Sequence, residues 1–175
     1  MKLFITGEPH SGKSTLMSKV IEAISPAQGF VTREVAPGGV RTGFELVSAS
    51  GDRALLAGVD VQSDVRVSRY GVDVAALDAF IARLPEPQEG EFIYVDEVGQ
   101  MELYSENFKK LVERYLSLPN PFIGTLTSVY EDDFTRQLKA RSDVEILNIT
   151  VENRDAMFAE IVERISRFTH SQRHE

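Results

Sequence analysis

The sequence predicts an α/β fold in which a three-layer, doubly wound, mostly parallel sheet carries a β-hairpin insertion. Two observations lead to this prediction. Short apolar runs, typical of buried strands, alternate with segments whose apolar residues recur at helical spacing. The first apolar run is followed by a glycine-rich loop, residues 7–14, where a strand should pass into a helix. Such alternation favours parallel strands with helices on both faces of the sheet.

Six strands are expected, and two of them should pair as a hairpin. Pro37-Gly38-Gly39 separates the second strand from the third and has the composition of a tight turn. The runs at 92–95 and 146–149 are short and apolar, as in strands buried on both faces. The expected strands are residues 3–6, 29–35, 43–48, 92–95, 121–125 and 146–149.

Five helices are expected, and their apolar faces are assigned to the core. Pro26 and Pro85 limit the first two, because proline cannot continue a helix. Ser105 is the expected N-cap of the third. The helical patterns run over residues 16–24, 74–84, 108–116, 132–140 and 157–165.

Length and composition indicate one globular domain, expected over residues 1–168, with a polar tail at 169–175. The net charge of −8 argues against a nucleic-acid partner. The absence of cysteine excludes disulfides and thiolate chemistry, and the histidines lack further ligands for zinc. No run approaches the roughly 18 apolar residues of a membrane span. We therefore expect a cytoplasmic protein without a membrane partner, and a monomer as the simplest state.

Residues 7–14 match the pattern G-x-x-x-x-G-K-[ST], which predicts a site for nucleotide phosphates. The glycines allow backbone N–H groups to surround a phosphate, and the following helix directs its positive end at the same anion. Lys13 supplies a cation for the β- and γ-phosphates and is a predicted catalytic residue. The Ser14 hydroxyl is a predicted ligand of Mg²⁺.

Asp96 and Glu97 follow directly on the apolar run 92–95, which predicts the second half of the site. A carboxylate at the C-terminal end of a neighbouring strand would lie opposite the loop. We assign Asp96 to the Mg²⁺ shell, through a water. Glu97 should project toward the γ-phosphate and orient an attacking water, as the second catalytic residue.

Several further residues are candidates whose roles the sequence leaves open. Thr125 or Thr127 could touch the γ-phosphate or the water, or could serve only strand formation. The loop at 150–154 could hold the base or simply cap the last helix. A cation could offset charge in the transition state, or could be solvated. The cationic candidates are Arg33, Arg41, Arg136, Lys139 and Arg141.

Together these residues resemble the THEP1-type nucleoside-triphosphatases, a family of small P-loop NTPases that includes the human cancer-related NTPase. The most specific matches are Gly38-Gly-Val-Arg41 in the hairpin and Asp96-Glu-Val-Gly-Gln-Met-Glu-Leu103. The resemblance implies a RecA-like or kinase-like P-loop sheet and Mg²⁺ dependence. It also implies hydrolysis of ATP, GTP and other NTPs to NDP and phosphate.

The resemblance further implies nucleotide contacts on two segments. At position 10, where relatives usually carry glycine, this chain has histidine, which we expect to be tolerated if its φ is negative. The expected contacts are Gly7, Glu8, Pro9, His10, Ser11, Gly12, Lys13, Ser14 and Thr15, with Asp96, Glu97, Val98 and Gly99.

Two other functions stay open on the same scaffold. One is a nucleoside, nucleotide or polynucleotide kinase, in which the hairpin and Arg66 or Arg69 grip an acceptor. The other is a nucleotide switch without catalysis, or a module of a larger assembly. The chain carries no N-K-x-D sequence, so a strict choice of guanine is unsupported.

Overall fold

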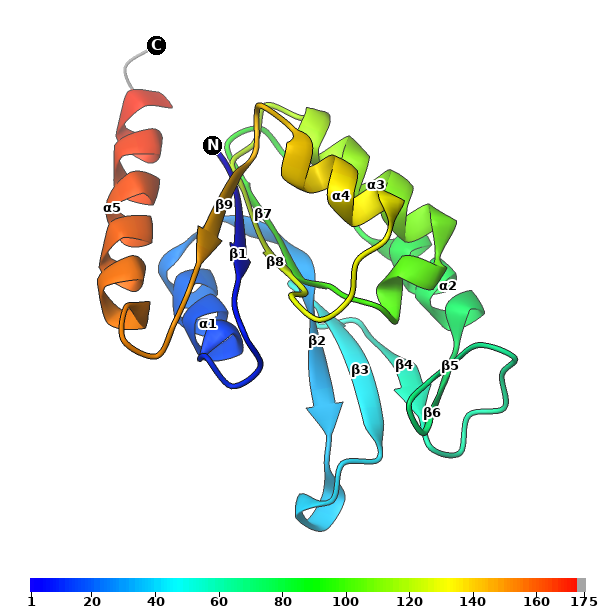
Figure 1. Cartoon of the computed structure of the whole chain (residues 1–175). Coiled ribbons are helices and arrows are strands. Elements are labelled where there is room, and N and C mark those ends of the chain that lie inside the picture. The colour runs from blue at the N-terminus through cyan, green and yellow to red at the C-terminus, as the bar shows by residue number, and fades with distance from the viewer. Residues whose placement is uncertain (173–175) are drawn as a thin grey trace.

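The computed structural model describes residues 1–172, in which nine strands form one mixed sheet (Figure 1). The order across the sheet is β5-β6-β4-β3-β2-β7-β8-β1-β9. The strands are β1 (Lys2–Thr6), β2 (Ala27–Val35), β3 (Gly43–Ser48), β4 (Arg53–Gly58), β5 (Arg66–Val67), β6 (Tyr70–Val72), β7 (Phe92–Val98), β8 (Phe122–Leu126) and β9 (Glu145–Asn148).

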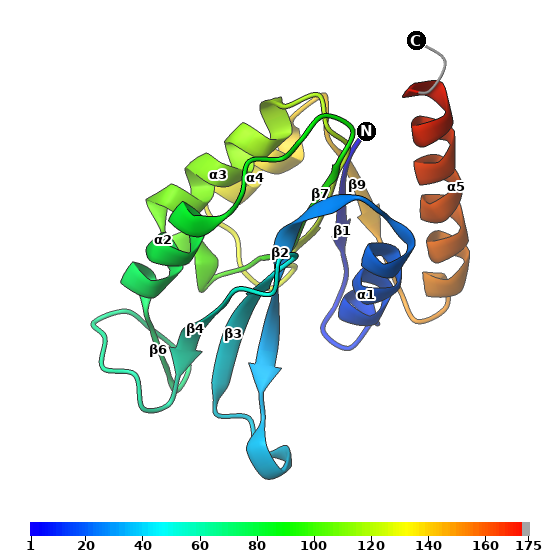
Figure 2. The same ribbon diagram turned by 180° about the vertical axis from the view of Figure 1, so that it is seen from behind.

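Helices cover both faces of the parallel half of the sheet, as Figures 1 and 2 show. One face carries α1 (Lys13–Ala23) and α5 (Arg154–Gln172), and the other carries α2 (Val74–Arg83), α3 (Glu106–Ser117) and α4 (Asp133–Ala140). Each pair of layers has its own apolar core. Phe30 lies on the α2–α3 side, with ring centroids 5.5 Å from Phe80 and 6.2 Å from Phe108. Over residues 1–172, no helix has the length and apolar character needed to cross a bilayer.

The predicted fold class is confirmed. Strands β2, β7, β8, β1 and β9 pair in parallel, and β3, β4, β5 and β6 extend the sheet with antiparallel pairs. The β2–β3 hairpin is present, and its turn uses positive φ at Gly38 (63°) and Gly39 (80°). Ser105 caps α3 as expected, because its hydroxyl accepts a hydrogen bond of 3.0 Å from the Phe108 amide.

Three features differ from the expectations. Strands β4, β5 and β6 were not predicted: β5 and β6 are too short to show a period, and β4 leaves Leu55 exposed. Helix α5 continues to Gln172, so the tail predicted from residue 169 is helical at its start; residues 173–175 lie outside the described part. The strand that carries Asp96 is also not the neighbour of β1, because β8 lies between them.

Candidate active site

The glycine-rich loop joins β1 to α1 with a geometry that requires its glycines. A Cβ at Gly7 would lie 2.6 Å from the carbonyl oxygen of Ile149, so a larger residue would force the backbone apart. Gly12 has a φ of 96° immediately before α1, a conformation that L side chains rarely adopt. The loop is therefore shaped by backbone constraints, as a loop that encloses an anion with main-chain N–H groups must be.

His10 departs from the expectation. Its φ is 65°, in the left-handed region, whereas we expected histidine to be tolerated here with a negative φ. Histidine is among the residues enriched in this region, although the conformation costs roughly 1–2 kcal/mol relative to right-handed backbone. The loop thus keeps a glycine-like conformation at a position without glycine.

Lys13 begins α1 and lies over the loop. Its ammonium is 3.4 Å from the carbonyl oxygen of Gly7 and 3.7 Å from a carboxylate oxygen of Glu97. The same Gly7 carbonyl accepts a hydrogen bond of 2.8 Å from the Ser128 hydroxyl, a contact that the sequence argument did not foresee. The Ser11 hydroxyl is buried without a hydrogen-bond partner, and an anion in the loop would supply one.

Asp96 follows the four buried residues Phe92–Val95 of β7, and Thr125 of the intervening β8 holds it in place. The Thr125 hydroxyl donates a 2.7 Å hydrogen bond to one carboxylate oxygen of Asp96. Burial, opposed by the hydrogen bond from Thr125 and reinforced by the charge of Glu97, raises the pKa of Asp96 to about 6. This threonine therefore orients the carboxylate, a role that the two expectations for Thr125 did not include.

The residues present suit Mg²⁺. Asp96 keeps one carboxylate oxygen outside its bond to Thr125, and Ser14 presents an exposed hydroxyl on the cavity that Asp96 also lines. Within residues 1–172, no three His, Cys, Asp or Glu side chains are grouped as a metal cage. A hydroxyl and a carboxylate, completed by waters and phosphate oxygens, form the type of oxygen shell that Mg²⁺ prefers.

A second acidic residue, Glu102, lies near Glu97 and is almost fully buried. A Cβ at Gly99 would lie 2.9 Å from a carboxylate oxygen of Glu102 and 3.0 Å from one of Glu97, so both side chains crowd this glycine. Glu102 is 3% exposed and accepts a 2.8 Å hydrogen bond from Thr32 of β2. Burial, followed by the charge of Glu97, raises the pKa of Glu102 to about 8. Glu102 is a carboxylic acid kept neutral beside the proposed catalytic carboxylate, which no sequence pattern indicated.

One cavity of about 650 Å³ brings most of the predicted site together. Ser11 lies beneath its surface, and Val98 is fully buried, so a nucleotide cannot touch the Val98 side chain. Thr127 also lines this cavity. The expected contact residues on its wall are Glu8, Pro9, His10, Gly12, Lys13, Ser14, Thr15, Asp96 and Glu97.

Of the cationic candidates, Arg41 lies on this cavity. Its guanidinium donates to the Tyr70 hydroxyl at 2.8 Å and to Glu34 at 2.9 Å, and Arg69 holds the Arg41 carbonyl at 2.6 Å. Arg69 therefore supports the hairpin and is not on the cavity wall. The cations of the α4 region form ion pairs with Glu131, Asp133 and Asp143 away from this wall; they are Arg136, Lys139 and Arg141.

A smaller cavity of about 260 Å³ lies beside the loop, between α1 and α5. Arg154 lines both cavities, and its side chain lies against Gly12. Lys19 lies 5.7 Å from the ring centroid of Phe158 in the smaller one. The loop at 150–154 also caps the start of α5. The Thr150 hydroxyl accepts a 3.2 Å hydrogen bond from the Asn153 amide, and the Asn153 side chain accepts one of 2.7 Å from the Thr150 amide. The expected capping role is therefore confirmed, and a role in holding the base stays a prediction. Lys19 and Phe158 were not among the candidate site residues.

Comparisons with known proteins agree with this arrangement. A family model described as NTPase matches residues 2–162. The nucleoside-triphosphatase THEP1 of Thermotoga maritima is 36% identical over 93% of this chain and 94% of its own length. The human cancer-related nucleoside-triphosphatase is 33% identical over 91% of this chain and 94% of its own length.

Two solved structures share the fold. The crystal structure of THEP1 from Aquifex aeolicus superposes with a TM-score of 0.80 at 29% identity, covering 94% of this chain and 99% of that one. The solution structure of the human cancer-related nucleoside triphosphatase gives 0.77 at 32% identity, covering 94% and 96%. The resemblance stated from the sequence is confirmed, and the chain belongs to the NTPase family.

Proposed function

We propose that this protein is a Mg²⁺-dependent nucleoside-triphosphatase that hydrolyses ATP, GTP and other NTPs to NDP and phosphate. The observation that carries the proposal is the meeting of the phosphate loop, the Ser14–Asp96 pair and Glu97 on one cavity. The relatives named nucleoside-triphosphatase support NTPs as the class of substrate. A carboxylate beside the loop favours attack by water.

Each residue has a distinct role in this proposal. Lys13 moves from its 3.7 Å pairing with Glu97 onto the β- and γ-phosphates, which leaves Glu97 available as a base. Glu97 orients the attacking water and accepts its proton. Ser14 and Asp96 would hold Mg²⁺, and the ion would supply charge neutralisation at the phosphates. Thr125 keeps the Asp96 carboxylate oriented.

Broad base specificity is also part of the proposal. The smaller cavity offers the Phe158 ring and the cations Lys19 and Arg154. Aromatic stacking and cationic contact tolerate every base, because every base has a π-face. We further infer a single functional domain over residues 1–168 that acts as a monomer in the cytoplasm.

The test is phosphate release from ATP, GTP, CTP and UTP, with Mg²⁺ and with a chelator. We expect release from all four nucleotides, and loss of release when Mg²⁺ is removed. Lys13→Ala should lose both nucleotide binding and turnover. Lys110→Ala, which removes an exposed lysine on α3, is the matched control and should behave as wild type. Unchanged turnover in Lys13→Ala would refute the assignment.

A further inference from the structure

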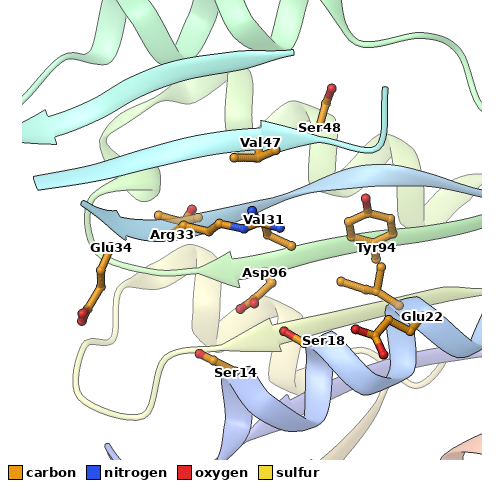
Figure 3. A pocket seen from close by; sticks show the side chains of 12 residues that line it. Ser14, Ser18, Glu22, Val31, Arg33, Glu34, Val47, Ser48, Tyr94 and Asp96 are labelled. Atoms are coloured by element: carbon orange, nitrogen blue, oxygen red, sulfur yellow. The ribbon is translucent and has the colours of Figure 1, made fainter. Parts of the chain in front are cut away.

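A second large cavity adjoins the phosphate site, on the α1 face of the sheet where β2 and β3 extend past α1 (Figure 3). Its volume is about 520 Å³, within the range of roughly 300–1,000 Å³ that is usual for small-molecule sites. Hydrolysis leaves this space unexplained, because the attacking water, the triphosphate and the metal ion are all accounted for in the neighbouring cavity.

The two cavities meet at the reacting end of the nucleotide. Ser14, Thr32, Glu34 and Asp96 line both of them. Ser14 and Asp96 are the predicted Mg²⁺ ligands, so the γ-phosphate would lie at this junction. A molecule in the second cavity could therefore place a hydroxyl group where the attacking water would otherwise lie.

The wall formed by α1 is polar and long enough for more than one functional group. Ser14, Ser18 and Glu22 follow one another at four-residue spacing, so they share a face of the helix and span about 12 Å. Figure 3 shows them along one side of the cavity, with Asp96 and Tyr94 of β7 on the other. Hydroxyl and carboxylate groups in such a row suit a ligand with several hydroxyls.

Other parts of the lining add apolar and aromatic contacts beside the polar Thr32 and Ser48, and the charged side chains are mostly negative. Ile21, Val31 and Val47 offer aliphatic contacts, and Tyr94 offers a ring. Among the lining side chains, the carboxylates of Glu22, Glu34 and Asp96 outnumber the single guanidinium of Arg33. An acceptor that carries its own phosphate would meet repulsion here. A neutral molecule with a planar ring and several hydroxyls fits, and a nucleoside has both.

We propose that this cavity binds a nucleoside whose hydroxyl accepts the γ-phosphoryl group of the bound NTP. The nucleoside oxygen forms a bond to the γ-phosphorus as the bond from that phosphorus to the β–γ bridging oxygen breaks. The NDP leaves with the bonding electron pair, and the hydroxyl proton passes to Glu97. The products are NDP and a nucleoside monophosphate. This inference rests on the nucleotide site of the proposed function.

The experiment follows labelled γ-phosphate from ATP with Mg²⁺ and each ribonucleoside or deoxyribonucleoside, and measures free phosphate and nucleoside monophosphate separately. We expect label in at least one nucleoside. Ser18→Phe places a ring in the cavity from an exposed position on α1 and should reduce transfer by roughly 100-fold. It should leave hydrolysis without nucleoside at the wild-type rate.

Ala23→Phe is the matched control, because Ala23 is also exposed on α1 but lies outside the cavity wall; it should keep both activities. Thermal unfolding of both variants checks their folding. Phosphate release with no label in any nucleoside would overturn this proposal and leave the NTPase intact. Two other results would also overturn it. One is transfer that Ser18→Phe leaves unaffected, and the other is transfer that occurs only when a nucleoside monophosphate or an oligonucleotide is supplied as the acceptor in place of a nucleoside. Absence of both free phosphate and labelled nucleoside in wild type would overturn both proposals.

Discussion

Glu102→Gln should stabilise the protein at alkaline pH and abolish one component of its pH dependence. Glu102 is buried and hydrogen-bonded to Thr32, and its burial raises the pKa of the carboxyl group to about 8. The folded state therefore holds this proton more tightly than the unfolded chain does. The stability linked to the proton is complete below the unfolded-state pKa and is lost as the pH rises toward 8.

The magnitude follows from linkage. Each pH unit between the two pKa values changes the free energy of unfolding by about 1.36 kcal/mol, so wild type should lose on the order of 4 kcal/mol between about pH 5 and pH 8 through Glu102. Glutamine has nearly the same shape, can accept the Thr32 hydrogen bond and carries no proton to lose. Between about pH 5 and pH 8, the free energy of unfolding of the variant should therefore rise relative to that of wild type by about 4 kcal/mol.

The assay is urea unfolding followed by far-UV circular dichroism at several pH values, since the chain has no tryptophan. Groups far from Glu102 titrate equally in both proteins, so the difference between the two curves isolates Glu102 together with its coupling to nearby acids such as Glu97. Glu89→Gln, in an exposed loop, is the matched control and should give a constant difference. A constant difference for Glu102→Gln as well would mean that this carboxyl group is ionised in the folded protein, and would refute the reasoning.

Three further predictions concern the site itself. Glu97→Gln should keep Mg²⁺–nucleotide affinity near wild type but slow phosphate release by roughly 10²–10⁴, the usual loss for a general base; a full rate would assign the water proton to another group. Thr125→Val removes the 2.7 Å hydrogen bond to Asp96 and should weaken Mg²⁺ activation by at least about tenfold in a metal titration, whereas an unshifted titration would show that Asp96 needs no such support. His10→Val should destabilise the fold by roughly 1–2 kcal/mol in urea unfolding, because a β-branched residue tolerates φ of 65° poorly, and His10→Gly should not; equal stability of the two variants would contradict this.

The parallel half of the sheet could be predicted because its signals are local. The apolar run before Asp96, the prolines that end helices and the Ser105 cap each depend only on residues close together in the sequence. The loop motif also specifies its own conformation through Gly7 and Gly12. These features follow from backbone sterics and burial, which a short segment of sequence already contains.

The missed features depend on contacts between residues far apart in the chain. Thr125 lies beside Asp96 because β8 lies between β7 and β1 in the sheet. No local sequence pattern shows whether β7 is adjacent to β1 or separated from it by β8. The raised pKa of Glu102 results from its burial and from the charge of Glu97. Its hydrogen-bond partner, Thr32, lies seventy positions away in sequence. The sequence alone could not show that Arg41, and not Arg136, lies on the phosphate cavity, because this depends on where the β2–β3 hairpin lies relative to the phosphate loop.

The most direct test of the account is a crystal structure with a non-hydrolysable NTP analogue and Mg²⁺. We predict that the amides of residues 7–14 surround the phosphates and that the Lys13 ammonium lies about 3 Å from a γ-phosphate oxygen. The cation should contact the Ser14 hydroxyl, with the Asp96 carboxylate one water away. A triphosphate bound outside the cavity shared by Lys13 and Glu97 would contradict the account.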